Sequence, residues 1–98
     1  MTREEIVAAI RKNAEAIRAE GVTKLAIFGS RARGDNRADS DIDVLIEVEP
    51  DVSFSILDLI GVEHIIQDAT GLPAQATMRR SMPSRFAERI ADDILEVF

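Results

Sequence analysis

The chain has 98 residues, of which 46% are hydrophobic and 31% are charged, a composition typical of a folded domain. This length predicts one domain over residues 1–98. Twelve basic and eighteen acidic residues give a net charge of -6, which opposes nonspecific binding to nucleic acid. We therefore expect no direct nucleic-acid contact. The absence of cysteine excludes disulfides and thiolate metal sites.

The N-terminal residues are charged and polar where a secretory signal would need an apolar run, and no apolar stretch approaches membrane-spanning length. We expect a cytoplasmic protein without membrane contact. A domain of this size buries only about two-thirds of its unfolded surface, so a protein interface would add stability. The composition is therefore compatible with a homo- or hetero-oligomer.

The first half of the chain predicts a helix, a strand, a loop and a second strand. A capping-box pattern followed by apolar residues at helical intervals predicts one amphipathic helix over residues 3–20. Short, nearly continuous apolar runs predict buried strands over residues 24–28 and 42–48. Residues 29–41 are rich in Arg, Asp, Gly and Ser, which predicts a long loop with room for one helical turn.

The second half predicts a helix, a strand and a final helix. Ser53 is expected to cap a helix that Gly71 ends, and residues 74–78 are expected to form a third strand. Pro83 suits the first position of the final helix. The apolar stripe of that helix comprises Phe86, Ile90, Ile94 and Val97. This order predicts an α+β or α/β-like fold, in which one layer of helices packs against a mixed sheet.

Two carboxylates and a Gly-Ser pair carry the chemistry that the sequence suggests. Asp41 and Asp43 are two residues apart at the start of a predicted strand, so their side chains point to one face and can share a divalent cation. Hard oxygen ligands favour Mg²⁺, which also binds phosphate oxygens and so implies a nucleoside triphosphate. Gly29 and Ser30 end the preceding strand and can present backbone N–H groups and a hydroxyl to the phosphates.

Arginines of the same loop are candidate phosphate ligands. Arg31, Arg33 and Arg37 can neutralise a triphosphate, because a guanidinium group holds two phosphate oxygens at once, although each can equally be solvated. A Gly-Ser turn or a pair of acids at a strand start is usually structural when it occurs alone. The spaced combination between two predicted strands is what favours a nucleotide site.

The run Phe28-Gly29-Ser30-Arg31-Ala32-Arg33-Gly34-Asp35, continuing to Ser40-Asp41-Ile42-Asp43, resembles the signature of the polymerase-beta-type nucleotidyltransferase superfamily. The closest match is its minimal, or MNT, branch. The resemblance covers nearly the whole chain, but only the motif is specific. It implies a small antiparallel or mixed sheet flanked by helices, catalytic Asp41 and Asp43, and transfer of a nucleoside monophosphate from ATP with Mg²⁺. Members often act as antitoxins of a HEPN-domain ribonuclease, and some transfer AMP to a tyrosine of that toxin, so a HEPN toxin is the implied partner.

The superfamily mechanism uses a third carboxylate from the strand after the second helix, and Gln75 occupies that position here. No Asp or Glu lies between Asp68 and Glu88, and Glu47 lies about 13 Å along its strand from Asp43. An amide oxygen can bind a metal but cannot take a proton. Two functions stay open: a Mg²⁺-dependent protein adenylyltransferase, and an antitoxin that neutralises its partner by binding alone. A nucleic-acid-binding module is the weakest alternative, because only clusters of arginines favour it.

Overall fold

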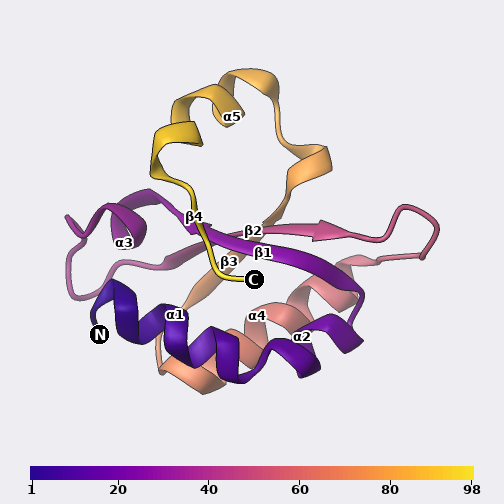
Figure 1. The fold of residues 1–98 in the computed structure, drawn as a ribbon, viewed down its shortest axis with the longest axis horizontal. Helices are drawn as coiled ribbons and strands as arrows, with labels where there is room; N and C mark the ends of the chain where they lie inside the picture. The colour runs from indigo at the N-terminus through magenta and orange to yellow at the C-terminus, as the bar shows by residue number, and fades with distance from the viewer.

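The computed structural model describes residues 1–98 as an α+β fold, with helices on both faces of one four-stranded sheet (Figure 1). The elements are α1 (Arg3–Lys12), α2 (Ala14–Ala19), β1 (Val22–Phe28), α3 (Gly29–Arg33), β2 (Ile42–Val48), α4 (Ile56–Thr70), β3 (Ala74–Met78), η1 (Arg79–Ser81), α5 (Ser84–Ile90), η2 (Ala91–Asp93) and β4 (Leu95–Glu96). None of the helices combines the length and apolar character that a membrane crossing requires.

The sheet has the strand order β3-β2-β1-β4 and is mixed, as the sequence predicts. β2 pairs antiparallel with β1 and parallel with β3, while β4 lies antiparallel on the other side of β1. β1 and β2 are therefore the central strands. Both of their faces are covered, which explains why each reads as a nearly continuous apolar run.

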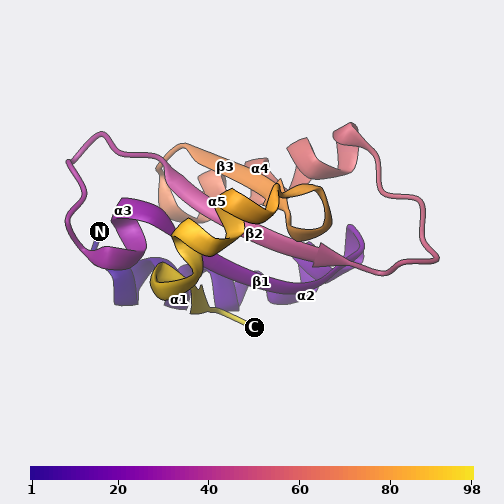
Figure 2. The ribbon, with the colours of Figure 1, turned by 90° about the horizontal axis from the view of Figure 1, so that it is seen from above.

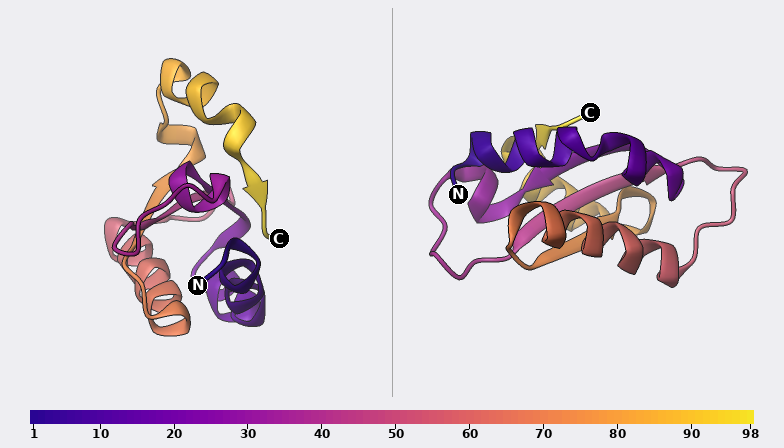
Figure 3. Two further views of the ribbon diagram at one scale, coloured as in Figure 1. Left: turned by 90° about the vertical axis from the view of Figure 1, so that its left-hand side faces the viewer. Right: turned by 90° about the horizontal axis from the view of Figure 1, so that it is seen from below.

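The main core lies between the sheet and the helices α1, α2 and α4, which lie side by side on one face (Figure 3). Alternate strand residues point into it, because side chains along a strand alternate between faces. Its fully buried aliphatic residues include Ile6, Ile10, Leu25, Ile27, Val44, Ile46, Val62 and Ile66. Burial of each such side chain contributes about 1.5–3 kcal/mol.

The opposite face carries α5, so the prediction of a single layer of helices is wrong (Figures 1 and 2). Phe28 and Leu45 of the central strands pack there against Ile90 at the end of α5. The Phe28 ring also meets the Phe86 ring edge-on, with 6.0 Å between centroids. The sheet needs this second cover because its middle strands are apolar on both faces.

Helix boundaries differ from the predicted ones where polar side chains compete with the helical pattern. The expected helix over residues 3–20 is interrupted at Asn13, whose side-chain amide donates to the Ala9 carbonyl at 2.9 Å. Ser55, not Ser53, caps α4, because it exchanges hydrogen bonds with Asp58 in a capping box. β1 begins at Val22, earlier than the sequence predicts.

The C-terminal segment departs most from expectation, since the predicted final helix ends at Ile90 and Pro83 lies before its first turn. Ile94 joins the α5 side of the sheet, whereas Val97 is buried in the main core. The Val97 N–H donates to the Leu25 carbonyl at 2.8 Å, so the chain end pairs with the open edge of β1. Residues at helical spacing are thus divided between the two faces of the sheet.

Helix side chains contact the C-terminal residues and the edge strand β3. Arg11 of α1 donates from Nε to the Val97 carbonyl at 2.8 Å, and the Arg18 guanidinium lies 4.6 Å from the centre of the Phe98 ring. At the other edge of the sheet, the Ala76 N–H of β3 donates to Glu63 Oε2 of α4 at 2.8 Å. A helix side chain thus occupies a backbone donor on the edge strand.

Candidate functional site

The two carboxylates and the Gly-Ser pair meet where β1 ends and β2 begins, beside α3 in Figure 1. Phe28, the last residue of β1, is opposite Asp43 in the antiparallel ladder. Asp43 shares the sheet face of Leu45, which is the face covered further along by α5. The site therefore has the sheet as its floor, α3 on one side and the α5 segment on another.

Gly29 lies directly against the Asp43 side chain. Its φ of +74° is in the left-handed region, and a Cβ there would overlap Oδ2 of Asp43 and lie 3.4 Å from its Cγ. Only glycine meets both conditions without strain. The carboxylate of Asp43 thus lies against Gly29, where α3 begins. A group bound by this carboxylate would therefore also touch the first residues of α3.

Electrostatics make this position suitable for a cation. Burial raises the pKa of Asp43 above its ordinary value, the charge of Asp41 raises it further, and Arg33 acts in the opposite direction. A cation between Asp41 and Asp43 would relieve their repulsion. Two carboxylates with waters and phosphate oxygens are a donor set that suits Mg²⁺. No group of three or more His, Cys, Asp or Glu side chains is arranged to hold a metal, so protein ligands alone would not complete the shell.

Gln75 lies next to this pair, as its sequence position suggests. It is opposite Asp43 in the parallel ladder between β2 and β3, so both side chains belong to one sheet face. Gln75 is exposed, and its amide can provide a neutral oxygen ligand in place of a charged carboxylate. Glu47 lies at the other end of β2, where it forms an ion pair with Arg79 at 3.6 Å.

Arg31 does not lie where a phosphate ligand would be expected, because it is only 3% exposed. Its Nε and Nη2 donate to the Ser40 carbonyl at 3.2 and 3.0 Å, and Nη2 also donates to the Ala38 carbonyl at 3.1 Å. The guanidinium therefore clamps α3 to the loop that leads into Asp41. In the structure Arg31 therefore positions the loop before Asp41, whereas the sequence suggested that it contacts phosphate.

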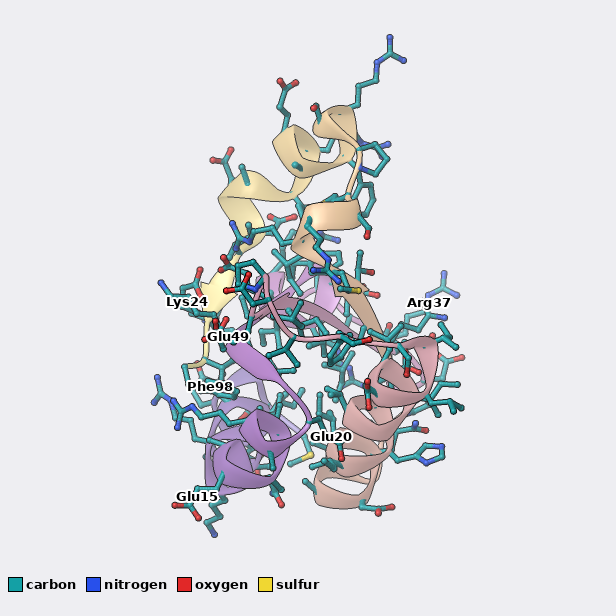
Figure 4. The ribbon with its side chains drawn as sticks, turned by 90° about the vertical axis from the view of Figure 1, so that its right-hand side faces the viewer. Glu15, Glu20, Lys24, Arg37, Glu49 and Phe98 are labelled. Atoms are coloured by element: carbon teal, nitrogen blue, oxygen red, sulfur yellow. The ribbon has the colours of Figure 1, made fainter.

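Arg33, at the end of α3, links the site to the C-terminal segment, because it acts on the charge of Asp43 and pairs with Asp93. Its guanidinium donates to Asp35 at 3.0 Å and to Asp93 of η2 at 2.9 Å, and these hydrogen bonds raise its pKa. Arg37 is exposed at the outside of the loop (Figure 4). The sequence alone does not indicate that Asp93 pairs with Arg33, because the two residues are 60 positions apart and Asp93 falls within an expected helix.

Comparisons with known proteins identify the family of this chain. A family model for the nucleotidyltransferase domain matches residues 8–96. The chain belongs to the polymerase-beta-like nucleotidyltransferase (MNT) family. It is 30% identical to the protein adenylyltransferase MntA of Thermococcus cleftensis over 99% of this chain and 97% of that relative. The resemblance inferred from the signature residues is therefore confirmed.

Solved structures of other MNT proteins share the fold. A structure provisionally described as a minimal nucleotidyltransferase matches with a TM-score of 0.72 and 25% identity, over 97% of this chain and 95% of that one. A chain in the complex of tri-AMPylated Shewanella oneidensis HEPN toxin with MNT antitoxin matches with a TM-score of 0.63, over 90% of this chain and 68% of that one. Its identity of 11% makes this a likeness of fold. The predicted α+β nucleotidyltransferase architecture is confirmed.

Proposed function

We propose that the protein is a Mg²⁺-dependent protein adenylyltransferase that acts as the antitoxin of a HEPN-domain toxin and transfers AMP from ATP to a hydroxyl of that toxin. The observation that carries the proposal is the Asp43 carboxylate, held beside Asp41 and directly over Gly29. The chain is also similar to a protein adenylyltransferase, and it shares its fold with a chain of the complex between an MNT antitoxin and a tri-AMPylated HEPN toxin.

In this proposal residues 1–98 work as a single minimal nucleotidyltransferase domain. Asp41 and Asp43 hold Mg²⁺, which neutralises phosphate charge when bound. The backbone of Gly29 and the hydroxyl of Ser30 receive phosphate oxygens. Arg33 is the remaining candidate for a phosphate contact, because its guanidinium is partly exposed and phosphate can replace its exposed partner Asp35.

The transfer forms a bond between the acceptor oxygen and the α-phosphorus and breaks the bond from that phosphorus to the bridging oxygen, so pyrophosphate leaves. Positioning and charge neutralisation supply most of the rate in such reactions. The acceptor proton goes to water, because Gln75 beside Asp43 cannot take it. We therefore expect slow transfer compared with an enzyme that has a third carboxylate.

The same glutamine favours a second candidate function, an antitoxin that neutralises its toxin by binding while the nucleotide site is a scaffold or relic. In that case an Asp41→Ala/Asp43→Ala double variant still binds and silences the toxin. Loss of neutralisation by a folded double variant that still binds would refute it. The two candidates thus differ in whether neutralisation needs the carboxylates.

The direct test is an assay with α-labelled ATP, Mg²⁺ and a purified HEPN-domain partner. We expect label on the partner with the wild-type chain and none with Asp43→Ala, whereas Glu88→Ala, an exposed acid on α5, serves as the control and keeps activity. An absence of label from the wild type, together with label from Gln75→Asp, would overturn the proposed transferase and favour binding alone.

A further inference from the structure

Helix α4 is apolar on two sides, and only one of them is used by the fold. Val62 and Ile66 are buried in the main core. Ile56, Leu57 and Ile60 lie on another side of the same helix and are 67%, 75% and 39% exposed. A surface helix normally shows one apolar stripe and polar residues elsewhere. The second stripe therefore has no role within this chain.

Val52, in the loop that leads into α4, is also 49% exposed. We call Val52, Ile56, Leu57 and Ile60 the α4 apolar patch. It holds four of the six large apolar residues that the whole surface exposes. Clustered exposed apolar residues of this kind mark interaction sites, whereas single ones need no explanation.

The surroundings of the patch are acidic. Helix α4 itself carries Asp58, Glu63 and Asp68 and no Lys or Arg. Asp68 is exposed on α4, toward its C-terminal end. The Glu20 carboxylate lies against α4, at 3.3 Å from the position of a Cβ on Gly61, and Figure 4 shows this side chain beside the helix.

We propose that the α4 apolar patch is a docking surface for a different protein, which presents a helical apolar stripe flanked by Lys and Arg. Opposite charges around an apolar centre guide association and exclude other partners. The inference rests on the proposed function only in taking the occupant to be a protein partner. The surface lies toward the end of β2 opposite to Asp43, and that end is about 17 Å along the strand from Asp43.

Charge argues against the other occupants. A symmetric contact through this patch would bring together two copies of α4, each with three acids and no Lys or Arg. A head-to-tail contact with the arginines of another copy leaves unpaired surfaces that extend into open chains unless the rotation closes. An anionic membrane would be repelled by the same acids.

The test uses a labelled synthetic amphipathic helix with a leucine stripe flanked by lysines, and its binding is followed by fluorescence anisotropy without ATP or Mg²⁺. We expect the wild-type chain to bind it and Leu57→Ser to bind at least about tenfold more weakly, as for a central interface residue. A peptide in which glutamates replace the lysines should not bind. Leu57 is exposed, so Leu57→Ser should fold normally, and circular dichroism checks this.

A matched pair of charge variants separates the local rim from net charge. Glu20→Lys/Asp68→Lys changes one acid that lies against α4 and one exposed acid of α4, and it should weaken binding. Glu15→Lys/Glu88→Lys makes the same change in net charge and should bind like wild type. Glu15 points away from α4 in Figure 4. Equal loss in both pairs would overturn the proposal, and so would unchanged binding by Leu57→Ser.

Two further outcomes would assign the patch to another occupant and also overturn the proposal. One is a dimer or chain in sedimentation that Leu57→Ser converts to monomer. The other is Leu57-dependent binding to phosphatidylcholine vesicles. Because the peptide assay contains no nucleotide, its failure leaves adenylyl transfer untouched, and an inactive enzyme would leave peptide binding unchanged.

Discussion

Among single residues, Gly29 determines how close the backbone after β1 can come to the carboxylate of Asp43. Gly34, at the end of α3, offers a natural comparison, because its φ is also positive at +84° but nothing lies within 4 Å of the place that a Cβ would take. Gly34 is required for its backbone conformation alone. Gly29 is required for its backbone conformation and because a side chain there would collide with Asp43.

Gly34→Ala should lower the free energy of unfolding by about 1–2 kcal/mol through left-handed strain. Gly29→Ala should cost more, because its Cβ must also displace Asp43. Urea unfolding measures the two costs. Thermal shift with Mg²⁺ and ATP should show that the Gly34 variant retains ligand stabilisation and the Gly29 variant loses it. Equal behaviour of the two variants would contradict the close approach.

Asp43 also predicts a dependence of stability on pH. Burial, and after it Asp41, raise the pKa of Asp43 while Arg33 opposes them, so folding favours the protonated carboxyl. Its stabilising contribution is fully present below the unfolded pKa and is lost as the pH rises through the folded pKa. Asp43→Asn should therefore be more stable than wild type at neutral pH without Mg²⁺, by at most about 1 kcal/mol for a partly exposed group.

Urea unfolding across a pH series checks this, with Asp39→Asn as an exposed control in the same loop. The advantage of Asp43→Asn should shrink as the pH falls into the acid range, because wild-type Asp43 then becomes protonated too. An advantage that stays constant with pH, or a less stable variant at neutral pH, would count against the assigned electrostatics.

At the scale of secondary structure, the start of α4 depends on one of two serines two residues apart. Ser55 accepts from the Asp58 N–H, and Asp58 Oδ2 accepts from the Ser55 N–H at 2.9 Å. Ser53 is exposed and caps nothing. Ser55→Ala should cost about 1 kcal/mol in urea unfolding, whereas Ser53→Ala should cost almost nothing. A larger loss for Ser53→Ala would place the cap where the sequence alone suggested it.

Most element types were predictable from sequence because apolar periodicity reports burial: β2 lies where its apolar run places it, and β3 covers the expected residues 74–78. Element ends were less so. Two serines compete to cap α4, and only the partner at Asp58 decides between them. The interruption at Asn13 depends on a side chain that bonds to its own helix, which the apolar pattern does not contain.

The candidate site shows the same division. Gly29, Ser30, Asp41 and Asp43 could be grouped because they flank two strands that pair, and Gln75 because it lies in the next strand. The clamp by Arg31 could not be predicted, since its acceptors are backbone carbonyls, which every residue has. Bonds from a side chain to backbone carbonyls leave no mark in a single sequence.

At the scale of the whole molecule, the last residues close the structure over β1. Val97 is buried in the main core, yet it comes from a segment whose spacing suggested a helix. Val97→Ala should lower the free energy of unfolding by about 2 kcal/mol, because it leaves a cavity in the main core. Val52→Ala makes the same substitution on an exposed side chain and should change stability by less than about 0.5 kcal/mol. Equal effects in thermal or urea unfolding would mean that the C-terminus is not part of the core.

The bond from Ala76 to Glu63 at the β3 edge has a consequence for how the protein behaves among its own copies. An open edge strand can template the addition of another strand, which is the first step toward sheet-driven aggregation. Here a carboxylate occupies one of the free backbone donors and places negative charge where an incoming strand would bring its carbonyl oxygens. The sheet is thereby capped by a side chain, and lateral growth into a longer sheet or a fibril is disfavoured at this edge.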